Sequence, residues 1–163
     1  MKKMKKNLSK IFVCIAFVAL SACSKDDSPN PGSASGSLGT FAGNIQVSDD
    51  PQTKLGYIYN AKVTVTKSGN NATIKIKGDL NVDREYTGTV ASSGNGNYYI
   101  NISKQTKPSA KNATESLVIN NNVLAFMIGV SNDSETVKAS PAATSSIVIS
   151  GKIQLIGTGM IKE

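Results

Sequence analysis

Apolar and polar residues alternate with a period of two along most of the chain from Gly39 onward. In the first such segment, Phe41, Ile45 and Val47 are separated by polar or small residues. Successive side chains of a strand point to opposite faces, so this alternation predicts strands with one buried face. No helical period of 3.6 residues stands out after residue 38. The pattern therefore predicts an all-β domain.

Turn-forming residues separate the alternating segments. Gly, Asn and Ser cluster at 67–71, 92–97 and 120–122, and each cluster lies between two apolar runs, which is typical of β-hairpins. The stretches 103–113 and 131–144 lack the alternation and each contains a proline, so we expect loops there. About eight short strands joined mainly by hairpins favour a single small antiparallel meander β-barrel, with a β-sandwich as the alternative.

The alternation also predicts which side chains share a face. Tyr57 and Tyr59 fall in step with Ala61, Val63 and Val65. In the last apolar run, Ile161 falls in step with the apolar positions from residue 147 onward. Glycines within that run indicate a bend or a bulge.

The first residues have the character of an export signal. A lysine-rich start is followed by an apolar run at 11–20, and small residues precede Cys23. A run of about ten residues is too short for a bilayer span, which needs about 20. Residues 20–22 before Cys23 resemble a bacterial lipobox. The resemblance implies that 1–22 is a lipoprotein signal peptide and that the thiol of Cys23 carries a lipid that anchors the protein to the membrane. Several acyl chains together give stable anchoring, which one chain alone does not.

The segment 23–38 is predicted to be a flexible linker. It is rich in Ser, Gly and Pro and has almost no apolar residues, so it cannot offset the entropy of ordering. Residues 24–27, Ser-Lys-Asp-Asp, resemble the export signal of Bacteroidetes surface lipoproteins. That resemblance implies an outer-membrane protein exposed at the cell surface. The folded domain is then 39–163.

Charge and composition narrow the chemistry. Five of the 18 basic residues lie in the predicted signal peptide, so 13 basic residues face 11 acidic ones in the mature part. This near balance gives no footprint for nucleic acid. The chain has no His, and its two cysteines are Cys14, in the signal, and Cys23. The domain therefore has neither the commonest general base nor a thiol, and we expect no cofactor and no metal.

The tyrosines are the candidate ligand-binding residues. An aromatic body with a polar tip suits an amphipathic pocket, and tyrosines on inward positions of a barrel can line one. More often such residues belong to the core or its rim. The four candidates are Tyr57, Tyr59, Tyr86 and Tyr98.

The segment 79–85 is the other site-like stretch. Oxygen-bearing side chains at alternate positions are similar to the first half of a calcium loop, but Arg84 occupies the position of its turn glycine. Asp83 and Glu85 are also a candidate carboxylate pair for a glycosidase. The plainer interpretation is a strand with Leu80 and Val82 inward and the acids in water.

The start of the domain, Gly39-Thr40-Phe41-Ala42-Gly43, resembles the first strand of lipocalin-like (calycin) barrels, with Phe41 at the position of their tryptophan. In calycins a late basic residue covers that ring, and here Lys152 or Lys162 has the corresponding place. The resemblance implies a binding module for a small apolar or amphipathic ligand. We therefore expect a non-enzymatic, membrane-anchored binding protein. The alternatives are an accessory that contacts another surface protein, and a hydrolase that uses Asp83 and Glu85.

Overall fold

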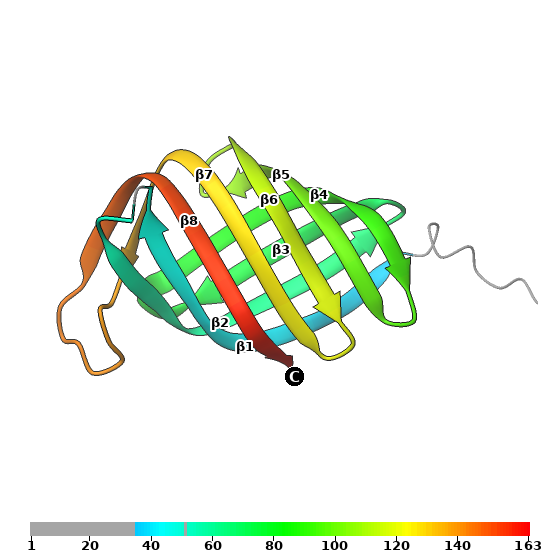
Figure 1. The fold of residues 1–163 in the computed structure, drawn as a ribbon, viewed down its shortest axis with the longest axis horizontal. Helices are drawn as coiled ribbons and strands as arrows, with labels where there is room; N and C mark the ends of the chain where they lie inside the picture. The colour runs from blue at the N-terminus through cyan, green and yellow to red at the C-terminus, as the bar shows by residue number, and fades with distance from the viewer. Residues whose placement is uncertain (1–34, 51) are drawn as a thin grey trace, which may run out of the picture. The chain divides into compact units, whose positions relative to one another are not determined.

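A computed structural model describes residues 35–50 and 52–163; the predicted signal peptide, Cys23 and most of the predicted linker lie outside the described residues. Eight antiparallel strands close into one barrel in which each strand pairs with its sequence neighbours and β8 pairs with β1 (Figure 1). The strands are β1 (Gly36–Asp49), β2 (Leu55–Ser68), β3 (Asn71–Gly78), β4 (Val82–Gly94), β5 (Asn97–Lys107), β6 (Lys111–Asn120), β7 (Val123–Val137) and β8 (Ile147–Lys162). The predicted all-β meander barrel is confirmed, and the sandwich alternative is wrong.

The two ends of the barrel differ in their connections. At the turn end, the two-residue turns 69–70, 95–96 and 121–122 join the strands. Asn95 and Gly96 have φ values of 50° and 78°, the positive pair that a tight hairpin turn of this kind requires. At the loop end, the connections are 50–54, the 3₁₀ turn η1 (Asp79–Asn81), 108–110 and 138–146, and the last of these is the long orange loop of Figure 1.

The strands extend further than the alternation predicts. β5 continues to Lys107 and β6 begins at Lys111, so the predicted loop at 103–113 is largely strand; β7 continues to Val137, so the predicted loop at 131–144 is strand in its first half. Register shifts lie between Asn101 and Lys104 and between Val130 and Asp133. A bulge interrupts the period of two, so a bulged strand of polar residues looks like a loop in the sequence. β1 also begins earlier than expected, at Gly36.

Apolar side chains fill the interior. Phe41, Ile74 and Leu117 are among the large side chains without exposed area. Even inward glycines have no space beside them: a Cβ on Gly56 would lie 2.1 Å from Cγ2 of Val137. Likewise, a Cβ on Gly157 would lie 2.3 Å from Cε1 of Phe126. Interiors are normally packed to this density, and here the packing occupies the space that a ligand would need.

A bulge in β2 turns two of the predicted tyrosines outward. Gly43 pairs with Ala61 and Ile45 pairs with Ile58, so Tyr59 and Asn60 stand opposite the single residue Asn44. Asn60 has a φ of 52°, and both Ile58 and Ala61 are buried. Tyr57 and Tyr59 therefore lie on the outer face, and the prediction that they share a face with Ala61 and Val63 is wrong.

A glycine near the end of β8 turns another residue that was predicted to point inward to the outer face. Gly159 has a φ of 63°, and the next residue, Met160, is buried while Ile161 is 57% exposed. The predicted inward position of Ile161 is therefore wrong, whereas the predicted bulge near the glycines is present. Residues 35–50 and 52–163 contain no helix with the length and apolar character of a membrane span.

Candidate functional site

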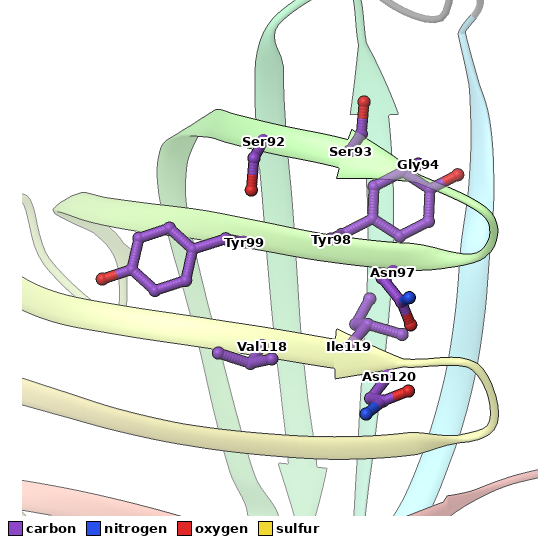
Figure 2. Close-up of a pocket in the computed structure, with 9 residues that line it drawn as sticks. All are labelled: Ser92, Ser93, Gly94, Asn97, Tyr98, Tyr99, Val118, Ile119 and Asn120. Atoms are coloured by element: carbon purple, nitrogen blue, oxygen red, sulfur yellow. The ribbon is translucent and has the colours of Figure 1, made fainter.

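Two hollows adjoin Tyr98 at the turn end. The first has a volume of about 390 Å³ and lies among the ends of β4, β5 and β6 (Figure 2). The second, of about 500 Å³, lies between the start of β1 and the turns 95–96 and 121–122, with Leu38 and Lys162 beside it. Tyr98 lines both. These volumes fall within the range of small-molecule sites, which is roughly 300–1,000 Å³.

The residues of the first hollow combine apolar and hydrogen-bonding groups. Tyr98 is half-buried against the core and Ile119 is buried. Figure 2 shows Tyr98 and Tyr99 pointing in different directions from β5, with Val118 and Ile119 on the neighbouring strand. Exposed hydroxyl and amide side chains surround them: Ser92, Ser93, Asn97 and Asn120. Such a lining can hold a molecule that has an apolar body and several polar groups.

Lys162 lies over the start of β1 at this end. It stands opposite Phe41 in the β1–β8 register. A Cβ on Gly39 would be 2.7 Å from Cε of Lys162 and 3.2 Å from Cε2 of Phe41, so the lysine stem and the ring approach the same point. Lys152, the other candidate for this position, instead pairs with Asp50 at 2.8 Å at the loop end. Gly39, with a φ of 143°, leaves the space that the lysine stem occupies.

The loop end is closed inside the barrel by a buried ionic network around Arg84, which is the only arginine of the chain. Its Nη1 donates to Oδ2 of Asp133 at 2.6 Å and to Oε1 of Gln105 at 2.8 Å. Its Nη2 donates to the carbonyl of Ser134 at 2.6 Å, and its Nε donates to Glu135. A second cation, the Nζ of Lys111, lies 2.7 Å from Oδ1 of Asp133. We call Arg84, Gln105, Lys111, Asp133 and Glu135 the ionic plug.

The partners in the ionic plug offset the cost of burying its charges. Burial by itself would lower the pKa of Arg84, but electrostatic interaction with Tyr86 and Glu135 and hydrogen bonds to Asp133 hold it above its ordinary value. Burial would raise the pKa of Asp133, but hydrogen bonds from Arg84 and Lys111 hold it below the usual 3.8. Two cations face two carboxylates, so the network is neutral. Its charged and polar groups bind one another, which suits a structural role.

Tyr86 lies on the inward face next to the ionic plug. Its side chain has no exposed area, and its hydroxyl has no hydrogen-bond partner among residues 35–50 and 52–163. Burial raises its pKa to about 12, although the nearby Arg84 opposes the shift. Tyr86 therefore belongs to the core.

The four predicted tyrosines do not share one site. Tyr57 and Tyr59 lie together on the outer face, with ring centroids 5.7 Å apart and planes inclined at 33°. Tyr86 is buried inside the barrel, and Tyr98 alone borders a hollow. Tyr98 stays the candidate for ligand contact.

The acidic residues of 79–85 also separate. Asp79 accepts from the amide of Asn60 at 3.1 Å, while Leu80 is exposed in a left-handed conformation rather than inward. Asp83 and Glu85 lie on the outer face of β4, 3.9 Å from Lys107 and 3.6 Å from Lys75. Within the described part of the chain, no three His, Cys, Asp or Glu side chains gather as metal ligands. The surroundings of the two acids are those of an ordinary solvated strand.

Sequence reasoning missed the ionic plug. Arg84 is an inward residue between the buried Val82 and Tyr86, and a lone arginine within an apolar alternation was a usable signal for a buried charge. Its carboxylate partners, Asp133 and Glu135, lie 49 and 51 residues further along the chain, so no local pattern reveals them. No known protein family, curated protein or solved structure matches the chain.

Proposed function

We propose that the protein is a non-enzymatic binding module of the outer membrane, anchored through a lipid on Cys23, that holds a small amphipathic ligand at the turn end of its barrel. One observation carries the proposal: the two hollows meet at Tyr98, whereas the interior is filled by side chains. The ligand therefore sits in the mouth of the barrel and not within it. Its apolar part rests on Tyr98 and Ile119, and its polar part faces Ser and Asn side chains.

The second candidate is an accessory that binds another surface protein. Exposed apolar side chains on the outside of β5–β8 favour it, among them Tyr99, Val118 and Met127. Because a closed barrel has no free edge strand, such a partner would bind side chains and could not add a strand to the sheet.

The first experiment titrates the protein with octyl glucoside below its micelle concentration, followed by calorimetry and NMR. This probe has an apolar chain and a hydroxyl-rich head group. We expect saturable binding with shifted amide signals at 92–98 and 118–122. Tyr98→Ala should abolish the binding, while Tyr59→Ala, on the outer face at the other end, should leave it intact.

Equal binding by both variants, or shifted signals that spare 92–98 and 118–122, would overturn the site at Tyr98. Native mass spectrometry of protein purified from membranes then gives the natural ligand as an added mass. A second spectrum, of the denatured protein, measures the lipid on Cys23 separately, because acylation is covalent and survives denaturation whereas a bound ligand is lost.

A further inference from the structure

The outside of the barrel carries an uncharged apolar surface on one side. Residues 97–101, 116–128 and 154–161 contain no Asp, Glu, Lys or Arg. Five large side chains that point outward from these segments are 40% exposed or more. We call the following six residues the outer apolar face: Tyr99, Val118, Val123, Ala125, Met127 and Ile161.

The outer apolar face is continuous across four strands. Tyr99 on β5 pairs with Val118 on β6, and Val118 pairs with Ala125 on β7. Val123 on β7 pairs with Ile161 on β8. Side chains of paired residues stand beside one another on the same side of a sheet, so the six form one surface. Contiguous exposed apolar surface on a soluble domain marks an interaction site.

The opposite side of the barrel is different in kind. Outward positions of β2, β3 and β4 carry Lys62, Lys75, Lys77, Asp83 and Glu85. The exposed Lys75 forms an ion pair at 3.6 Å with the partly buried Glu85, and Lys77 stands opposite Asp83 in the register. That side is suited to water. The barrel thus has one side that favours water and one that does not.

The place where the chain enters the barrel identifies what the outer apolar face contacts. β1 begins at Gly36 at the turn end, and the 12 residues 24–35 separate it from Cys23. An extended chain of that length reaches at most about 45 Å, so an anchored Cys23 keeps the turn end near the bilayer. Tyr99, Val123 and Ile161 all lie within a few residues of the turn end, and Lys162 follows directly. Tyrosine and lysine beside an apolar surface suit the boundary between lipid and water.

We propose that the outer apolar face lies against the lipid bilayer that holds the anchor. The inference rests on the proposed lipidation of Cys23 and goes beyond it, because a tether alone leaves the domain free to turn. Tyr99 and Val118 also line the first hollow, so the hollow opens at the lipid surface. The ligand of the binding module is then an amphipathic molecule that is taken up from the membrane.

The chain has no tryptophan, so a single one introduced by mutation is an unambiguous reporter. Met127→Trp places it in the outer apolar face, and Thr66→Trp places it at the same end on the charged side, where Thr66 is also exposed. Each full-length lipoprotein is purified from membranes and reconstituted in vesicles of phosphatidylcholine with brominated acyl chains. We expect Met127→Trp to lose most of its emission relative to plain vesicles, and Thr66→Trp to lose none. Ala125→Trp provides a second reporter in case the first variant does not fold.

Four outcomes separate the proposals. If Met127→Trp floats with the vesicles and is unquenched, the docking inference is wrong while the anchor stands. If the protein does not float and Cys23 has its unmodified mass, the anchor fails and the docking inference fails with it. A blue-shifted emission that bromine does not quench, together with a doubled mass in solution, assigns the outer apolar face to contact with a second copy of the chain. That result overturns the proposed contact with the bilayer. If bromine quenching of Met127→Trp is lost when Ile161→Asp is added, while the protein still floats with the vesicles, the proposed contact with the bilayer is supported.

Discussion

The two ends of the barrel close the same apolar interior with different chemistry. At the loop end, the ionic plug places charged groups inside the barrel, and each partner is another member or a backbone group. At the turn end, Leu38 of β1 is buried, the stem of Lys162 lies beside Gly39, and hollows remain beside Tyr98. Buried charged groups that are already paired with one another are therefore no sign of a binding site. Space beside exposed polar groups is the better sign.

The largest expected effect comes from Arg84→Met, which keeps an unbranched apolar stem and removes the guanidinium. Asp133, Glu135 and Gln105 then lose their shared partner in a buried place, and we expect the free energy of unfolding to fall by about 3–5 kcal/mol. Urea unfolding measures the loss. Lys75→Met breaks the outer-face pair of the exposed Lys75 with Glu85 and should cost at most about 1 kcal/mol. Similar losses in the two variants would mean that the ionic plug does not stabilise the loop end.

A methyl group added to each end tests the packing. Gly56→Ala at the loop end places a Cβ 2.1 Å from Val137, and we expect a loss of about 1–3 kcal/mol in the free energy of unfolding. Gly94→Ala at the turn end has no atom within 4 Å of the new Cβ, and it should change stability by less than about 0.5 kcal/mol. A neutral Gly56→Ala would show that the interior has free space after all.

Acid should weaken the loop end first. Hydrogen bonds from Arg84 and Lys111 outweigh burial and hold the pKa of Asp133 below 3.8 in the folded protein. The unfolded chain therefore binds this proton more readily, and the stability from Asp133 is full above pH 3.8 and lost as pH falls through the lower folded pKa.

Asp49, whose pKa is lowered chiefly by the hydroxyl of Thr53, contributes with the same sign. Urea unfolding between about pH 2 and pH 6 measures the slope that these groups produce. Asp133→Asn should flatten the slope, and an unchanged slope would contradict the assignment to Asp133.

The smallest expected effect is a gain. The hydroxyl of Tyr86 is buried without a hydrogen-bond partner in the described part of the chain, so Tyr86→Phe should raise the free energy of unfolding by about 1 kcal/mol. The raised pKa of about 12 adds a second signature, because wild-type stability is lost as pH rises from the unfolded tyrosine value of about 10 through 12. The variant should lose less in that range. A destabilised Tyr86→Phe would show that the hydroxyl has a partner, for which Arg84, whose charge acts on the pKa of Tyr86, is the candidate.

Much of the fold could be predicted from the sequence, and little of the candidate site. The hairpin turns at 69–70, 95–96 and 121–122 follow from Gly and Asn, which tolerate positive φ. The grouping of the four tyrosines, by contrast, depended only on the alternation of inward and outward positions along each strand. The bulge at Asn60 exchanges inward and outward positions before it, so Tyr57 and Tyr59 point outward. Of the four, Tyr98 lies beside the hollows described above.

The sequence by itself determined the strand rhythm, the tight turns and the absence of histidine and thiol chemistry from the domain, because each depends on residues that are local in the chain. The tertiary structure decided the rest. Closure of the barrel brought Arg84 to Asp133, and the positive φ of Gly159 sent Ile161 to the outer apolar face. A bulge depends on the register between two strands, and a contact between distant residues depends on the order of all eight. Neither is encoded in the alternation of a single strand.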